Sequence, residues 1–236
     1  MRTPPQSFIE SASHMGIAFD GDDLDRLGRW LELLVRGNER MNLTRILHPE
    51  DAWHRHVLDS LSLLPMVHSS EAGCLVDIGS GGGAPGIPLA IVCPHLRIGL
   101  VETTGKKADF LNETASDLGL SNITVYKDRA ERLASSDGPQ RETWDLVTAR
   151  AVGRLPVLLE LMVGFARVGG HLLAIKGDQA QQEIAEARGA LHRLHVGVVD
   201  TIRTTTGTVV VVEKNRPTPK RYPRAAGEPK RSPLVD

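Results

Sequence analysis

Short runs rich in β-branched residues alternate with helical segments from Cys74 to Lys214, and this alternation limits the folds available to the chain. The predicted strands are Cys74–Ile78, Arg97–Glu102, Ile123–Lys127, Trp144–Arg150, His171–Lys176, His195–Ile202 and Thr208–Lys214. Strands that alternate with helices require a parallel sheet with helices on both faces. Because only a short connection precedes the apolar run Val209–Val212, the last two strands are candidates for antiparallel pairing. We therefore expect an α/β fold with a seven-stranded, mostly parallel, doubly wound sheet.

Helical periodicity appears between the strands and also upstream of them. The intervening helices are predicted at Ile87–Val92, Lys106–Leu118, Leu155–Arg167 and Ala180–Arg193. Upstream, leucines with helical spacing predict a helix over Asp22–Met41, and a second helix is expected from about His48 to Pro65. These patterns divide the chain into an N-terminal helical lobe (1–70), an α/β domain (71–214) and a basic, proline-rich tail (215–236).

The composition is that of a globular chain with its own hydrophobic core. Of 236 residues, 41% are hydrophobic and 24% charged, and a chain this long buries about 70% of its unfolded surface. Cys74 and Cys93 have no partner at metal-ligand spacing, so no metal site is expected. Met1–Glu10 lacks the apolar core of an export signal, and no apolar run approaches roughly 18 residues. We expect a cytoplasmic protein that does not enter a membrane.

Basic residues are concentrated at the end of the chain, although the formal net charge is only -1. The basic residues between Lys214 and Val235 are Lys214, Arg216, Lys220, Arg221, Arg224, Lys230 and Arg231, against the single acid Glu228. Prolines in the same segment favour an extended backbone that keeps these cations apart and exposed. The tail is therefore either a solubilising segment or a strap that binds a polyanion.

A glycine-rich turn, Asp77–Pro88, follows the first predicted strand and leads into a helix. This is the place where an α/β sheet binds a nucleotide-like ligand. Glycine permits positive φ and lets a ligand approach the backbone. Because Gly79, Gly81 and Ala84 also satisfy a dinucleotide fingerprint, the spacing alone does not identify the ligand.

Two features of the turn favour S-adenosylmethionine over a dinucleotide. The carboxylate of Asp77 would repel a pyrophosphate but suits the ammonium group of the methionine moiety. Pro85 and Pro88 move the regular helix away from the glycines. Glu102, at the end of the second strand, can accept hydrogen bonds from both ribose hydroxyls, which is expected for either ligand.

Further motifs make a resemblance specific. Besides Asp77–Pro88 they are Glu102 with Lys106-Lys107 and Phe110-Leu111, Arg129-Ala130-Glu131, Arg150-Ala151, Met41-Asn42-Leu43-Thr44, Arg55-His56-x-x-Asp59-Ser60-Leu61, Lys176-Gly177, and Tyr222-Pro223-Arg224 with Gly227 and Pro229. In this order they resemble the bacterial small-subunit (16S) ribosomal RNA guanine-N7 methyltransferase family, also called glucose-inhibited division protein B. The resemblance runs from about Trp30 to the end of the chain.

The resemblance implies a class I S-adenosylmethionine-dependent methyltransferase fold, with 71–214 as the methyltransferase domain. Gly79 and Ala84 would line the donor pocket, Glu102 would bind the ribose, Ala130 and Glu131 would flank the adenine, and Arg150 would sit at the mouth as a positioning residue. The full set of predicted cofactor-binding residues is Asp77, Gly79, Gly81, Ala84, Glu102, Ala130, Glu131 and Arg150.

Methyl transfer to guanine N7 needs little from the protein. The acceptor nitrogen has a lone pair and no proton, so no general base is required, and alignment of acceptor, methyl and sulfur is the main contribution. Transfer to an exocyclic amine commonly uses Asn or Asp before Pro-Pro-aromatic after the fourth strand, where this chain has Thr148–Ala151. Transfer to pyrimidine C5 needs a reactive thiol, whereas Cys74 and Cys93 are expected to be small buried hydrophobes.

Several cations are candidates for RNA contact. The predicted RNA-binding residues are Arg55, Lys106, Lys176, Lys220, Arg221, Arg224 and Lys230. Arg150 and Lys176 end predicted central strands beside the ligand crevice, where a stabilising salt bridge is the alternative role. Lys106 opposes the dipole of its helix and so invites an anion, or else only solvates the helix start. His54 and His56 lie on different helix faces, which favours a surface role over a metal pair.

The sequence thus predicts a monomeric enzyme that methylates N7 of a guanine in 16S ribosomal RNA or in a small-subunit assembly intermediate. The target base is expected to be unstacked, because a pocket of this kind cannot admit a paired base. Two alternatives remain open: a nicotinamide-dependent oxidoreductase that uses the same glycine turn, and a non-catalytic ribosome-assembly factor that binds RNA through its tail.

Overall fold

The computed structural model describes residues 1–150 and 153–235. Ala151, which belongs to one of the motifs above, lies outside the described residues, as does Asp236. Two compact units are distinguished, the first formed by Met1–Gly73 with Ser80–Lys127 and the second by Cys74–Gly79 with Asp128–Asp236. The division into lobe, domain and tail after residues 70 and 214 stays a prediction, and each unit is described by itself.

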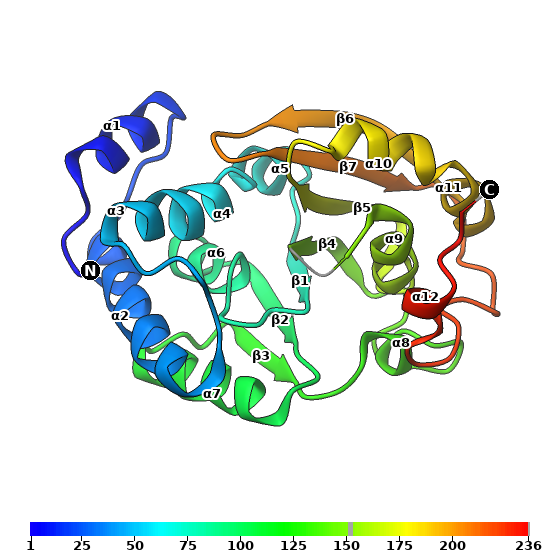
Figure 1. Ribbon diagram of the computed structural model, residues 1–236, viewed down its shortest axis with the longest axis horizontal. Coiled ribbons are helices and arrows are strands. Elements are labelled where there is room, and N and C mark those ends of the chain that lie inside the picture. Colours follow the sequence, from blue (N-terminus) through cyan, green and yellow to red (C-terminus); the bar gives the residue numbers. More distant parts are fainter. Residues whose placement is uncertain (151–152, 236) are drawn as a thin grey trace. The chain divides into compact units, whose positions relative to one another are not determined.

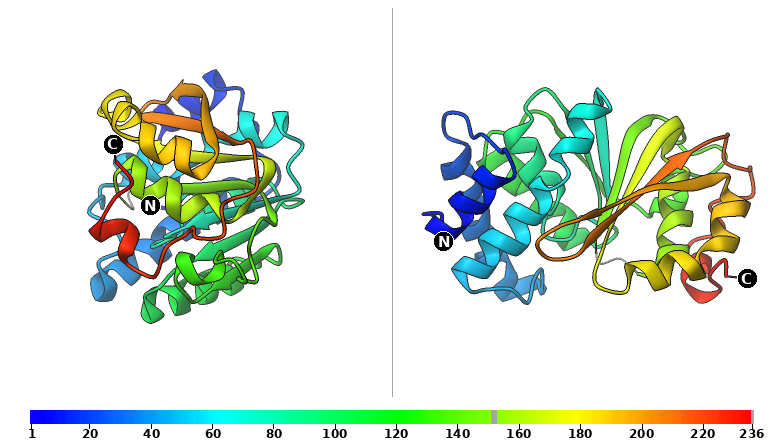
Figure 2. Two further views of the ribbon diagram at one scale, coloured as in Figure 1. Left: turned by 90° about the vertical axis from the view of Figure 1, so that its right-hand side faces the viewer. Right: turned by 90° about the horizontal axis from the view of Figure 1, so that it is seen from above.

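Seven strands form one sheet in the order β3-β2-β1-β4-β5-β7-β6 (Figure 1). The strands are β1 Cys74–Ile78, β2 Arg97–Val101, β3 Ile123–Tyr126, β4 Trp144–Arg150, β5 Ala166–Lys176, β6 Val196–Arg203 and β7 Thr208–Lys214. Pairs β1–β4, β2–β3 and β4–β5 are parallel, whereas β5–β7 and β6–β7 are antiparallel. The predicted mostly parallel sheet is confirmed, as is the antiparallel pairing of the last two strands, which form the hairpin visible in Figure 2.

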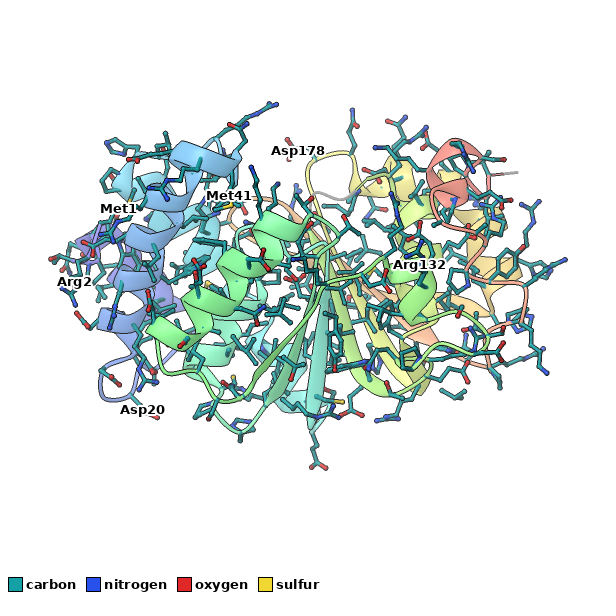
Figure 3. All side chains as sticks on the ribbon, turned by 90° about the horizontal axis from the view of Figure 1, so that it is seen from below. Met1, Arg2, Asp20, Met41, Arg132 and Asp178 are labelled. Atoms are coloured by element: carbon teal, nitrogen blue, oxygen red, sulfur yellow. The ribbon has the colours of Figure 1, made fainter. Side chains whose placement is uncertain are left out.

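The first unit carries β2, β3 and most of the helices. These are α1 Gln6–His14, α2 Asp23–Met41, α3 Pro49–Ala52, the π-helix η1 Trp53–Leu58, α4 Asp59–Leu61, α5 Leu64–Ser69, α6 Gly86–Val92 and α7 Gly105–Asp117. Sequence periodicity did not predict α1, which is held by Phe8, fully buried with its ring 4.7 Å from that of Trp53. Met1 and Arg2 lie beside α2 (Figure 3), where Arg2 pairs with Asp25 at 3.0 Å.

The prediction of one regular helix from His48 to Pro65 is wrong, both in where the helix ends and in its continuous α-helical geometry. The chain is helical from Pro49 to Leu61, with the π-helix in the middle, and a separate helix α5 starts at Leu64. Pro65 lies in the first turn of α5, where a proline loses no hydrogen bond because the N–H groups of that turn have no helical partner. Proline therefore marks a helix start here.

The second unit contains the other five strands and five helices among its described residues. The helices are α8 Ala130–Leu133, α9 Leu155–Val163, α10 Ala180–Glu186, α11 Arg188–Leu194 and α12 Glu228–Arg231. The predicted helix Leu155–Arg167 is too long, because β5 already begins at Ala166 instead of His171. Gly169 and Gly170 interrupt the strand pattern in the sequence and hid this start. The predicted helix Ala180–Arg193 is two helices, because the buried Ala187 has φ -87° and ψ 2°.

Lys214 at the end of β7 contradicts the expectation of an exposed basic tail. Its side chain is fully buried, and Nζ donates to the Val163 and Ala166 carbonyls at 3.0 and 2.7 Å and to Glu142 Oε1 at 2.7 Å. Burial is the largest influence on the pKa of Lys214 and lowers it, against the opposing effect of Glu142. A buried cation needs such a set of acceptors, and none of them can be recognised from the residues around Lys214 in the sequence.

We expect the Glu142–Lys214 pair to make stability depend on acid pH. Burial alone would raise the pKa of Glu142, but hydrogen bonds from Lys214 and the Thr218 amide lower it overall. A lowered folded-state pKa contributes stability at neutral pH that is lost as pH falls from the ordinary glutamate value through the lowered one. Between about pH 5 and pH 3, wild type should lose about 1–2 kcal/mol more unfolding free energy than Glu142→Gln in urea titrations. Equal losses in the two proteins would contradict this assignment.

Candidate active site

In the first unit, Glu102 follows directly after β2 and has a fixed carboxylate. Its side chain is buried, Oε2 accepts a hydrogen bond from the Gly81 amide at 3.0 Å, and Oε1 accepts one from the Thr104 amide at 2.7 Å. Each oxygen keeps a lone pair for a further donor. The geometry therefore presents an anionic, two-oxygen acceptor at the carboxyl end of a parallel strand, as expected for a group that binds paired hydroxyls.

The glycine turn has the conformation that only glycine adopts without strain. Gly79, Gly81 and Gly83 have φ of 74°, 54° and 100°. At Gly82 the reason is space, since a Cβ there would lie 2.5 Å from Cδ1 of Leu34 in α2. Helix α6 begins only at Gly86, after Ala84 and Pro85, as the prolines predicted. The turn is therefore a fixed loop, and it lacks the helix start directly after the glycines that would bind a phosphate.

In the second unit, Asp77 and Arg150 lie near the carboxyl ends of neighbouring parallel strands. Asp77 is 1% exposed and is paired in register with Thr148 of β4, two residues before Arg150. Arg150 is half-buried. Such strand ends are where open α/β sheets bind their ligands. A buried carboxylate directly before the glycine turn fits a cationic group and opposes a phosphate.

Ala130 and Glu131 open α8 in the same unit, and both are buried. The carboxylate of Glu131 is engaged within the protein, because Oε1 accepts the Gly227 amide at 2.7 Å. Glu131 and Gly227 belong to two of the motifs that carry the family resemblance, but the sequence does not predict a contact between residues so far apart in the chain.

Two of the predicted RNA-binding cations are used inside the second unit, which makes those predictions wrong as exposed RNA contacts. Lys176 is 9% exposed and bonds Glu183 and the Gly153 carbonyl, each at 2.7 Å. Arg224 is 18% exposed and bonds the fully buried Glu160 at 2.6 Å. In both cases the cation forms an ion pair with a carboxylate on a helix, and composition does not reveal such partners.

The remaining predicted RNA-binding residues are exposed: Arg55, Lys106, Lys220, Arg221 and Lys230. The guanidinium of Arg221 stacks over the Tyr222 ring at 5.0 Å. The expected surface role of His56 is wrong, because its ring is buried and Nε2 lies 2.9 Å from the hydroxyl of Thr44. That contact ties two of the sequence motifs together within the first unit.

Both cysteines are buried, as predicted. Cys74 starts β1 and Cys93 caps α6, with 6% and 1% exposure. Burial raises the pKa of Cys93 to about 11, with a smaller contribution from Asp23. Within residues 1–150 and 153–235, no group of three metal-ligating side chains occurs. The described helices also include none that is long and apolar enough to cross a membrane.

We expect neither cysteine to act as a nucleophile in the native protein. Thiol reagents attack the thiolate, which at pH 8 is a fraction of about 0.001 for a thiol whose pKa is raised to about 11. Ellman's reagent at pH 8 should therefore react with the folded protein at least 100-fold more slowly than with the protein in 6 M guanidinium, where both thiols react. Fast labelling of one thiol in the folded state would contradict this assignment.

Comparisons with known proteins agree with the geometry. Residues 23–208 match the GidB family model, described as rRNA small subunit methyltransferase G. The "Ribosomal RNA small subunit methyltransferase G" of Sorangium cellulosum is 47% identical over 222 residues, which cover 94% of this chain and 92% of the relative. The protein of the same name from Desulfitobacterium hafniense is 41% identical, with 94% and 93% covered. The chain belongs to the GidB family.

The fold of this GidB-family chain is similar to solved methyltransferases of lower sequence identity. The O-methyltransferase TomG from Streptomyces achromogenes, solved in complex with SAM, has a TM-score of 0.59 and 14% identity, with 88% of this chain and 96% of TomG covered. An O-methyltransferase from Bacillus cereus in complex with SAH has a TM-score of 0.58 and 17% identity, with 87% and 96% covered. The predicted class I methyltransferase fold is confirmed.

Proposed function

We propose that the chain transfers the methyl group of S-adenosylmethionine to N7 of a guanine in 16S ribosomal RNA or in a small-subunit assembly intermediate. The observation that carries the choice of cofactor is the buried carboxylate of Asp77, directly before the glycine turn. It suits the ammonium group of the donor, whereas the pyrophosphate of a nicotinamide dinucleotide would meet an anion there. Family membership supports the ribosomal RNA substrate and disfavours the oxidoreductase.

The residues of each unit fit parts of the donor. In the first, Glu102 would accept the ribose hydroxyls, and Gly81 and Ala84 would lie along the ligand. In the second, Asp77 would bind the ammonium group, Gly79 would admit the ligand to the backbone, and Ala130 and Glu131 would flank the adenine. Glu102 supports this role most directly, since two backbone amides already orient its carboxylate.

When bound, the donor supplies a methyl group whose bond to the sulfonium breaks as the bond to N7 forms, with the electron pair leaving on sulfur. The chain's own contribution is alignment, which can supply roughly 7–11 kcal/mol of the barrier. Arg150 would position the incoming base or its phosphate. No side chain needs to remove a proton, because guanine N7 carries none.

The exposed cations are the proposed RNA surface, with Arg55 and Lys106 in the first unit and Lys220, Arg221 and Lys230 in the second. Phosphate contacts by Lys and Arg release counterions, so affinity falls with salt in proportion to their number. We further propose that the protein acts as a monomer in the cytoplasm, where its ribosomal substrate is assembled.

We expect the three tail cations to contribute to RNA affinity through charge alone. Replacing Lys220, Arg221 and Lys230 together by Gln should reduce the slope of log affinity against log salt by about 2–3, at about 0.7–0.9 for each phosphate contact. Filter binding of 16S RNA between 50 and 300 mM KCl measures this slope. An unchanged slope would show that these three tail residues do not contact the RNA.

Incubation of the protein with methyl-labelled donor and 16S RNA tests the proposed function. After digestion, the label should appear in 7-methylguanine. No transfer to free or subunit-bound RNA at saturating donor would favour the assembly factor, and label in another base, in protein or in a metabolite would reject the substrate assignment.

A further inference from the structure

The residues that follow β7 pack onto the second unit and hold both ends of α8, the helix that carries Ala130 and Glu131. We infer that the segment 218–231, named here the C-terminal clamp, positions the donor-binding residues of α8, so that donor affinity depends on Arg224 and Gly227. This inference rests on the proposed function, since it takes α8 to flank the adenine.

Gly227 holds the beginning of α8. Its amide donates to Oε1 of Glu131 at 2.7 Å, and Glu131 is only 9% exposed. Gly227 has φ 82°, and a Cβ there would meet no atom within 4 Å. Glycine is therefore needed at this position for its backbone conformation, which directs the amide toward the carboxylate.

Arg141 joins the end of α8 to the same clamp. Nη1 donates to the carbonyls of Ala134 and Tyr222 at 2.8 and 3.0 Å, and Nη2 donates to the Thr218 carbonyl at 2.7 Å. Ala134 is the residue that ends α8. One guanidinium thus fixes the distance between the helix end and two points of the clamp, with charge-assisted hydrogen bonds.

Arg224 anchors the clamp to α9. Its backbone amide and Nε donate to Oε1 of Glu160 at 2.9 and 2.8 Å, and Nη2 donates to Oε2 at 2.6 Å. Glu160 is fully buried, so this two-pronged pairing has one geometry that a lysine cannot reproduce. Helix α12, which follows the anchor, lies next to α9 (Figure 1).

Helix α8 depends on these contacts because it is too short to hold itself. It has four residues and no side-chain cap at its start, and isolated helices shorter than about 12 residues are marginal in water. Its position is therefore set by what it touches. If the clamp held α8 less firmly, the positions of Ala130 and Glu131 would vary while the strands stayed unchanged. Arg224 and Gly227 are therefore positioning residues.

The test measures donor affinity by calorimetry with the full chain and no RNA, in Arg224→Lys and the matched control Arg231→Lys. Arg231 lies in α12, is exposed, and forms no side-chain hydrogen bond or ion pair within the described residues. Arg224→Lys should raise the Kd for S-adenosylmethionine about tenfold, with Arg231→Lys within twofold of wild type. At saturating donor, kcat and the KM for RNA should stay within twofold, which a general loss of structure would not allow.

A second pair of variants identifies the link. If the clamp acts through Glu131, Arg224→Lys combined with Glu131→Ala should bind donor no more weakly than Glu131→Ala alone. Unchanged Kd in Arg224→Lys, or additive effects in the double variant, would overturn the inference, and a wild type that binds no donor would instead overturn the proposed function. If Arg224→Lys does not unfold cooperatively on heating, Gly227→Ala provides the test, because a Cβ meets no atom there but strains the backbone at φ 82°. A Kd raised about threefold is then expected, and an unchanged Kd would contradict the clamp.

Discussion

Replacing Arg224 by Ala is expected to lower the free energy of unfolding by about 3–5 kcal/mol. The reason is the carboxylate of Glu160, which is fully buried in α9 and is bonded by the backbone amide and guanidinium of Arg224. Removing the guanidinium leaves an uncompensated charge away from water. Urea unfolding followed by circular dichroism measures the loss.

The matched control is Arg231→Ala, which removes the same charge from the same segment at an exposed position. It should change the free energy of unfolding by no more than about 0.5 kcal/mol. Equal stability of the two variants would show that the Arg224–Glu160 pair is not an anchor. Glu160→Gln should restore part of the stability in the Arg224→Ala background, because a neutral amide is less costly to bury.

Replacing Glu102 by Ala is expected to weaken donor binding by about 2–3 kcal/mol, or roughly 30- to 150-fold in Kd. The carboxylate is held by the amides of Gly81 and Thr104, so it would receive ribose hydroxyls without rearrangement. Hydrogen bonds to a charged acceptor are the strong ones. Calorimetric titration with S-adenosylmethionine in the absence of RNA measures the loss directly.

Glu113→Ala supplies the control for Glu102→Ala, because Glu113 is an exposed glutamate on α7 of the same unit. It should bind donor with a Kd within twofold of wild type. Glu102→Gln keeps two polar atoms but only one acceptor, and should fall between wild type and Ala. A Kd unchanged by Glu102→Ala would show that Glu102 does not bind the ribose of the donor.

The sheet was largely predictable, because its central strands β1, β4 and β7 are almost entirely buried and stand out as apolar runs. β1, β4 and β7 begin and end where the sequence pattern placed them. β5 was cut short in the prediction because Gly169 and Gly170 look like a turn. The helix boundaries near Pro65 and Ala187 were also predicted wrongly, because each boundary depends on the backbone angles of a few residues, which composition does not specify.

The tail shows what a sequence pattern cannot reveal. Its prolines and cations are typical of an exposed segment, yet Lys214 and Arg224 each have a carboxylate partner in a distant part of the chain. Glu160 lies within an apolar helix, where only a tertiary partner can compensate its charge. The proposed donor-binding residues of the turn could be predicted without knowledge of tertiary contacts, because a ligand loop follows directly from its strand.

The central claim is that the turn after β1 accepts a sulfonium nucleoside and not a phosphate-bearing cofactor, with Asp77 as the deciding charge. Calorimetry of the wild-type protein with S-adenosylmethionine and, separately, with NAD tests it most directly. We predict saturable binding of S-adenosylmethionine, which Asp77→Asn weakens at least tenfold, and no measurable heat with NAD. Saturable binding of NAD, or no binding of the methyl donor, would contradict the account.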